Sequence, residues 1–342
     1  MLRQHAWFCC TVFLAGVCAA AGAQSIPNTA PVFHFDALPP AAAVVFTAEA
    51  PPAGPPSPEL SSLETIHRDV DEVRLIFSVR KRDGRFVSDL TQEEVDVLDD
   101  ERAPDKINFF QAQTDLPLRI GLVIDVSDSI TERFRFEQNA AVSFLRRTLR
   151  PATDEAFVVA FNSAVKEVQG WTSDSKRLET AIRSLHPGGS TALYDAVAHA
   201  ALQMGMASKR SERRVIVLIT DGMDNQSKAT LQRTIETALR CDVVVYALST
   251  NSTYVNQSGD VVLTQLAGAT GGRVLRADGD HQISRAFESI QRELRSQYML
   301  AYKPADFKAD GRYRTIRVRS RKRVKLLVQA RRGYFAPRAP SM

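Results

Sequence analysis

The chain has 342 residues, a net charge of +5 and an apolar fraction of 44%. This length allows one or two folded domains, with a core large enough to fold without disulfides. Three of the four cysteines (Cys9, Cys10 and Cys18) lie within the first 24 residues, and only Cys241 lies beyond them. An internal disulfide is therefore excluded from the rest of the chain, and neither a cysteine-based metal site nor a cysteine nucleophile is supported.

Residues 1–24 have the pattern of a secretory signal peptide. Arg3 precedes an almost wholly apolar run from Trp7 to Ala21, and Ala21-Gly22-Ala23 supplies small residues for cleavage before Gln24. The run is short for a membrane span, so an uncleaved anchor is the lesser alternative. We therefore expect an exported protein, periplasmic or secreted and extracellular, with no transmembrane segment after signal cleavage.

Residues 25–68 are predicted to be a disordered spacer. Residues 25–62 alone contain nine of the sixteen prolines, together with many alanines and few charges. Such a composition buries too little apolar surface to offset the entropy of ordering, and we expect an extended linker.

Residues 69–114 and 298–336 are predicted to form one small β-sandwich-like domain from two parts of the chain. In the first part, apolar residues alternate with polar ones from Val73 to Val79. In the second, Ile316, Val318, Val324, Leu326 and Val328 share one parity and five basic residues the other, which predicts a basic antiparallel hairpin.

Residues 117–297 alternate apolar strands with amphipathic helices. Strands are predicted at 118–125, 156–161, 215–219 and 243–248, and helices at 132–150, 175–185, 192–207, 230–239 and 282–294. Continuous Val, Ile and Leu runs are typical of parallel strands that are buried on both faces. The fold class is therefore α/β, a doubly wound and mostly parallel sheet inserted in the small β domain, with a ligand site at the carboxyl ends of its strands.

Three loops at these strand ends carry oxygen-bearing side chains. The first strand ends in Asp125-Val-Ser127-Asp-Ser129, and a glycine-containing loop places Thr191 before a helix. A third strand ends at Asp221. A hard cation such as Mg²⁺ prefers about six oxygen ligands. Each loop alone is also explained by helix capping or an ordinary turn, but all three meet at one edge of a doubly wound sheet.

These residues resemble the metal-ion-dependent adhesion site of von Willebrand factor type A domains. The resemblance implies that Ser127, Ser129 and Thr191 ligate a cation directly, and that Asp125 and Asp221 act mainly through water. It implies Mg²⁺, with Mn²⁺ or Ca²⁺ as alternatives, and a partner protein whose Asp or Glu completes the shell. The chain is also similar to bacterial secreted proteins that carry such a domain within a β-rich frame.

Two other functions are weighed against this cation-dependent adhesion. A metal-dependent hydrolase is disfavoured because Ser127 stands where phosphatases of similar fold carry an acid, and because no nucleophile elbow or phosphate loop is present. We expect a binding protein rather than an enzyme. Residues 311–342 contain nine Arg, two Lys and no acidic residue. They favour, as a secondary role, metal-independent binding of the predicted hairpin to an anionic envelope surface, with no nucleic acid as partner.

Overall fold

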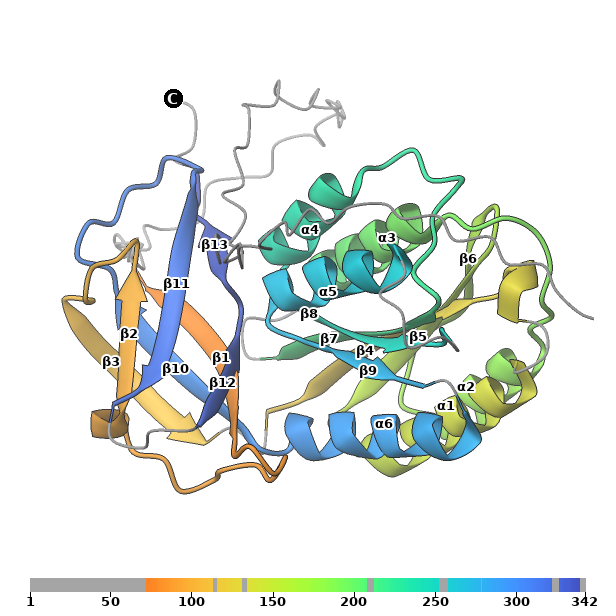
Figure 1. The fold of residues 1–342 in the computed structure, drawn as a ribbon, viewed down its shortest axis with the longest axis horizontal. Coiled ribbons are helices and arrows are strands. Elements are labelled where there is room, and N and C mark those ends of the chain that lie inside the picture. The colour runs from red at the N-terminus through yellow and green to blue at the C-terminus, as the bar shows by residue number, and fades with distance from the viewer. Residues whose placement is uncertain are drawn as a thin grey trace, which may run out of the picture. The chain divides into compact units, whose positions relative to one another are not determined.

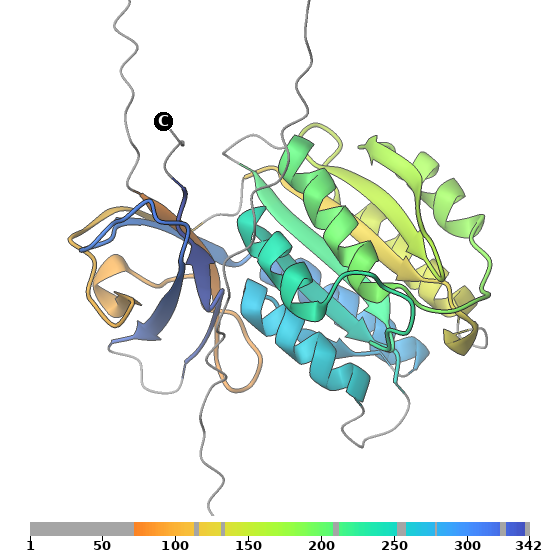
Figure 2. The same ribbon diagram turned by 90° about the horizontal axis from the view of Figure 1, so that it is seen from above.

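A computed structural model describes residues 72–112, 116–130, 134–207, 212–251, 258–277, 279–321 and 326–338. The predicted signal peptide and spacer lie outside these described residues. Within the described ranges, no helix combines the length and the apolar character needed to cross a membrane. Figures 1 and 2 show a helix-covered sheet and two smaller antiparallel sheets.

The central sheet has six strands in the order β6-β5-β4-β7-β8-β9. Five of them are parallel, and β6 runs antiparallel to β5 at one edge. This confirms the predicted α/β class. The strands are β4 (Leu118–Asp125), β5 (Glu155–Phe161), β6 (Val165–Thr172), β7 (Arg213–Thr220), β8 (Val243–Ser249) and β9 (Val274–Arg276).

Helices cover both faces of this sheet (Figure 2), which is why its middle strands are mostly apolar on both faces. One face packs against α1 (Phe134–Thr148), α2 (Ser175–Arg183) and α6 (Asp280–Leu294). The other packs against α3 (Leu193–Ala207), α4 (Leu231–Arg240) and α5 (Ser258–Thr270). We refer to β4 through α6 as the α/β region.

Two antiparallel sheets combine strands from both ends of the described chain, and we call them the β region. The larger has the order β12-β1-β10-β3 and the smaller the order β13-β11-β2. Strands from before the α/β region are β1 (Val73–Arg80), β2 (Val95–Asp99) and β3 (Lys106–Ala112). Those from after it are β10 (Gln297–Lys303), β11 (Tyr313–Ser320), β12 (Leu327–Ala330) and β13 (Gly333–Phe335).

The prediction that the basic C-terminal strands pair with each other as a hairpin is wrong. Strand β11 pairs with β2 and β13, whereas β12 pairs with β1 in the other sheet. Strand β2 and the turn that follows it bring carboxylates to β11, where Arg317 pairs with Glu101 and Arg321 with Asp96. The cationic strand face is thus partly neutralised within the fold, which weakens the hypothesis of an anionic surface as ligand.

A buried carboxylate holds the two ends of the β region together. Both Tyr302, in β10, and Tyr334, in β13, donate a hydrogen bond to the same oxygen of Asp99, at 2.8 and 3.0 Å. Burial raises the pKa of Asp99, and the two tyrosine hydroxyls partly offset that rise. Strands β2, β10 and β13, which come from before and after the α/β region, therefore meet at this residue.

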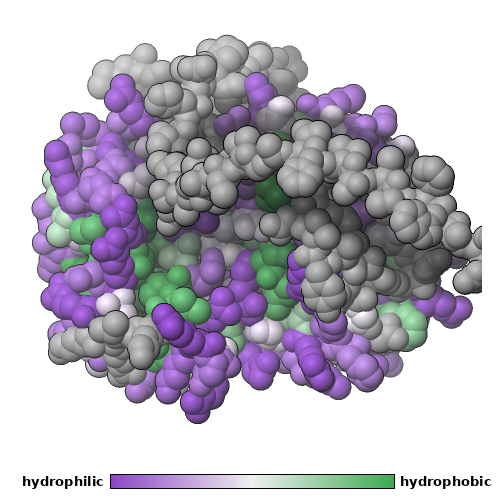
Figure 3. All heavy atoms as spheres, in the orientation of Figure 1, coloured by the Kyte–Doolittle hydropathy of each residue, from purple (hydrophilic) through white to green (hydrophobic). Residues whose placement is uncertain are grey.

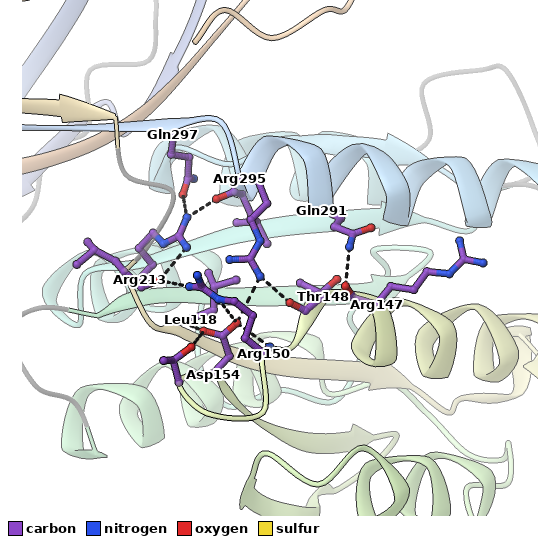
Figure 4. A network of polar contacts seen from close by, with 12 residues as sticks. Leu118, Arg147, Thr148, Arg150, Asp154, Arg213, Gln291, Arg295 and Gln297 are labelled. Carbon is purple, nitrogen blue, oxygen red and sulfur yellow. Dashed lines mark hydrogen bonds and ion pairs between the residues drawn. The ribbon is translucent and has the colours of Figure 1, made fainter.

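A second polar network ties the helices to the sheet at the amino-terminal ends of its strands (Figure 4). The buried carboxylate of Asp154 accepts from the backbone N–H groups of Leu118 and Arg150, and it pairs with the guanidinium groups of Arg150 and Arg295. Arg213 is buried beside them, and burial together with the charge of Arg295 lowers its pKa to about 10. This end of the sheet is structural and lies opposite the strand ends described next.

Candidate functional site

Asp125 is the last residue of β4, and its side chain is fully buried. One carboxylate oxygen accepts the backbone N–H of Ser127 at 2.9 Å. The other accepts the hydroxyl of Thr220, the last residue of the neighbouring strand β7, at 2.6 Å. Asp125 thereby shapes its own loop and joins it to the end of β7.

The two serines that follow Asp125 present their hydroxyls to each other. Ser127 Oγ and Ser129 Oγ are 3.1 Å apart, with Ser127 buried and Ser129 exposed. A short 3₁₀ turn (Asp128–Ile130) holds this spacing. One buried and one exposed hydroxyl therefore lie side by side and provide two neutral oxygen atoms that could bind a cation.

The second predicted loop packs against the first through its backbone. Gly188 donates to the carbonyl of Val126 at 2.7 Å, and Asp128 donates to the carbonyl of Gly189 at 3.1 Å. Both glycines have positive φ, +154° and +96°, a conformation that residues with a Cβ rarely adopt. The side chain of Asn162, which follows β5, donates to the Gly188 carbonyl at 2.6 Å.

Thr191 closes this loop and connects it to the third. Its backbone N–H donates to the side-chain oxygen of Asn225 at 2.9 Å, and its carbonyl accepts from the backbone of Asn225 and Gln226. The residue is buried, with 6% of its surface exposed. The loop after β7 therefore fixes the position from which the Thr191 hydroxyl is presented.

Asp221 follows Thr220 directly and is half-buried. Its carboxylate accepts the backbone N–H of Met223 at 3.0 Å, and its carbonyl accepts from Asn251 at 2.8 Å. Gly222 lies against Gly259 at the start of α5, so closely that a Cβ on Gly222 would lie 2.5 Å from the Gly259 carbonyl oxygen. Glycines at both positions let this turn sit on the helix.

The five predicted residues thus lie on three loops that are joined pairwise by hydrogen bonds. Burial raises the pKa of Asp125, the hydrogen bonds from Thr220 and Ser127 oppose the rise, and the nearby charge of Asp221 adds to it. A cation would relieve this crowding of negative charge. The donors are all carboxylate and hydroxyl oxygens, which fit Mg²⁺, Mn²⁺ or Ca²⁺.

No cluster of three or more His, Cys, Asp or Glu suited to a metal ion occurs among the described residues. Any cation here would therefore depend on hydroxyl ligands.

Sequence reasoning missed three residues that support the site: Asn162, Thr220 and Asn225. Each directly follows or ends a strand, or lies in the loop that follows one, so position at a strand end was an available signal. Their bonding partners, in contrast, lie on other loops and become visible only in the fold.

Part of the chain matches a known family model. Residues 120–223 match the family model described as von Willebrand factor type A domain. No curated protein matches the chain.

Three solved structures are similar to part of this chain. A von Willebrand factor type A protein from Catenulispora acidiphila has 13% identity and a TM-score of 0.47, with 80% of this chain and 76% of that one covered. An aerotolerance-related membrane protein from Bacteroides fragilis has 18% identity and a TM-score of 0.42, with coverages of 52% and 98%. The PilB minor pilin from Streptococcus sanguinis has 14% identity and a TM-score of 0.44. That match covers 54% of this chain and 62% of the pilin, less than two thirds of its length.

Proposed function

Because residues 120–223 match the family model of the von Willebrand factor type A domain, we propose that the chain is a protein-binding module whose affinity depends on a divalent cation. The cation is held by Asp125, Ser127, Ser129, Thr191 and Asp221, and a partner protein completes its shell with an Asp or Glu carboxylate. Mg²⁺ is the expected cation, with Mn²⁺ or Ca²⁺ as alternatives. The function is adhesion without catalysis.

The observation that carries this proposal is the pairwise joining of the three loops. Thr220 connects β7 to Asp125, the backbone of Gly188 and Gly189 connects the second loop to the first, and Asn225 connects Thr191 to the third. Rigid support of this kind is what a metal site requires of its surroundings, because the ligands must keep their positions before the ion binds.

The chemistry of the donors supports an open coordination position. In the proposed arrangement the hydroxyls of Ser127, Ser129 and Thr191 contact the cation directly, and the carboxylates of Asp125 and Asp221 orient its water molecules. Neutral hydroxyls leave the charge of a divalent cation poorly balanced. An acidic side chain from another protein is then the ligand that this site favours.

The rest of the chain is proposed to display this domain outside the cytoplasm. Residues 1–24 would direct export and 25–68 would act as a spacer. The β domain, composed of residues 69–114 and 298–336, would carry the type A domain at residues 117–297. The joining of β1 and β3 with β10 in one sheet supports this division.

A pull-down from cell-envelope extract tests the proposal. The mature chain is immobilised and exposed to extract with Mg²⁺ or with chelator, alongside Asp125→Ala and Thr191→Ala. We expect a partner retained only with Mg²⁺ and lost in both variants. Asp83→Ala, which removes an exposed carboxylate in the turn after β1, serves as the control. Chelator-independent capture, or full binding by a correctly folded Asp125→Ala, would contradict the proposal.

A further inference from the structure

An open groove of about 490 Å³ lies between helix α5 and strands β11 and β12, remote in sequence from the cation-site loops. Its volume falls in the range of typical ligand sites. Four arginines line it (Arg273, Arg317, Arg331 and Arg332), and no lining residue carries a carboxylate. Hydrophilic and hydrophobic residues lie next to one another on the face of the molecule seen in Figure 3.

The four arginines differ in how far they are engaged within the fold. Arg273 pairs with the buried Glu293 at 2.7 Å, and Arg331 pairs with Asp242 at 2.6 Å, so both serve internal contacts. Arg317 pairs with Glu101, but both side chains are about half exposed or more. Exposed pairs of this kind contribute little to stability, and a new ligand can replace them.

Arg332 is the arginine left for a ligand. Its backbone N–H donates to Ala269 of α5 at 3.2 Å, which anchors the residue at the groove. Its guanidinium lies over Gly268, where an added Cβ would be 3.3 Å from the nearest nitrogen. Within the described residues its guanidinium has no carboxylate partner. Because Gly268 has no side chain, the positively charged guanidinium of Arg332 can pack against α5, and the glycine does not neutralise its charge.

The same groove offers apolar surface. Val274, Val318 and Val328 line it and are only half-buried, and the more deeply buried Ile316 lies with them. Val318 and Val328 belong to the edge of the core of the β region. A ligand that covers them would bury apolar area while its acidic groups meet Arg332 and Arg317.

We propose that this groove binds an acidic, amphipathic peptide segment of a partner protein, independently of any cation. A peptide suits it better than a lipid bilayer because the arginines line a groove, which a chain segment can enter and a flat bilayer surface cannot. It suits it better than an acidic polysaccharide because valines line the groove, and a sugar chain has no apolar side chains to cover them. Guanidinium–carboxylate bonds would fix the position of the peptide, and the valines would add contact area.

Binding of a designed probe to the full chain in the presence of chelator tests this. The probe is a short fluorescent peptide that alternates glutamate and leucine, with a lysine–leucine peptide for comparison. We expect Arg332→Ala to weaken binding of the acidic probe about tenfold, the effect of losing one charge-assisted hydrogen bond. Arg319→Ala, an exposed arginine of β11 outside the groove, should change it by less than about twofold.

A charge reversal separates recognition from folding. Arg332→Glu should lose the acidic probe and gain affinity for the lysine–leucine peptide, a reversal that misfolding cannot produce. Equal binding of the acidic probe by wild type and Arg332→Ala would overturn the proposal. It would also be overturned if vesicles of phosphatidylglycerol and phosphatidylcholine bound through Arg332 while the peptide did not.

Discussion

The Thr220 hydroxyl donates a 2.6 Å hydrogen bond to the buried carboxylate of Asp125, and these two residues end neighbouring parallel strands. Thr220 also accepts the backbone N–H of Gly222 at 3.1 Å. One hydroxyl therefore shapes the turn that carries Asp221 and orients Asp125 at the same time. Two loops of the proposed cation site share this single support.

Removing that hydroxyl should weaken the cation site. Thr220→Val keeps the shape of the side chain but leaves one oxygen of Asp125 without its donor, which costs about 1–3 kcal/mol of stability. We expect Mg²⁺ affinity, measured by calorimetry, to fall about tenfold. Thr220→Ser keeps the hydroxyl and should bind Mg²⁺ like the wild type. Equal Mg²⁺ affinity in the valine variant would show that Asp125 needs no such support.

Asn225 should control the position of Thr191. Asn225→Ala removes the oxygen that accepts the Thr191 backbone N–H, and we expect partner binding in Mg²⁺ to weaken at least about tenfold. The free energy of unfolding should fall by only about 1 kcal/mol. Asn225→Asp retains an acceptor oxygen and should recover most of the binding. If the alanine and aspartate variants bind equally, this bond does not position Thr191.

Asp154 should make the fold sensitive to acid. Burial alone would raise the pKa of Asp154, but hydrogen bonds from the backbone of Leu118 and Arg150, and from the Arg150 side chain and Thr153, outweigh it and lower the pKa. The folded carboxylate therefore binds its proton more weakly than the unfolded one. Its contribution is present above the ordinary pKa, about 3.9, and is lost as pH falls through the lowered value.

Urea unfolding at a series of pH values measures this contribution. Asp154→Asn should destabilise the protein at neutral pH by about 3 kcal/mol, because it leaves the partly buried Arg150 and Arg295 without their carboxylate, and should flatten the acid dependence. The control Glu288→Gln removes an exposed ion pair with Arg147, which connects α6 with α1. This variant should cost under about 1 kcal/mol of stability. An unchanged acid dependence in Asp154→Asn would refute this assignment.

Asp99, which binds Tyr302 and Tyr334, should affect stability in the opposite direction from Asp154 as pH falls. Tyr302→Phe and Tyr334→Phe each remove one donor and should cost about 1–2 kcal/mol at neutral pH. The double variant should cost more than the sum, since it strips both donors from one buried oxygen. Because the pKa of Asp99 is raised, protonation favours the folded state, so the double variant should regain stability as pH falls through that pKa. Thermal melts at neutral and mildly acidic pH measure this, and strict additivity without pH dependence would argue against it.

Much of the α/β region could be predicted from the sequence because its signals are local and strong. The run Leu118–Asp125 is apolar apart from Arg119 and the final Asp125, and it forms β4 with those bounds. The elements that were missed lack such signals. Strand β6 is an antiparallel edge strand of mixed polarity, and α5 contains two glycines and several β-branched residues, which disfavour helix in isolation.

The predicted basic hairpin failed for a different reason. Alternation from Ile316 to Val328 correctly indicates strands, but alternation says nothing about which strand pairs with which. Strand β12 pairs with β1, and strand β11 pairs with β2, both far away in the sequence. These pairings place β11 and β12 in separate sheets. The same limit applies to the candidate site: its residues follow from strand ends, whereas the supporting contacts of Thr220 and Asn225 depend on loops meeting in space.

Strands β3 and β10 pair antiparallel, with Ala112 opposite Tyr298, although the whole α/β region lies between them in the chain. That region therefore occupies the loop of a single β-hairpin. The points at which the backbone leaves and rejoins the sheet are about one strand spacing apart, roughly 5 Å. A tight turn in place of the α/β region would preserve the pairing of β3 with β10. We therefore expect that the α/β region can be removed or replaced by another domain while the β region still folds.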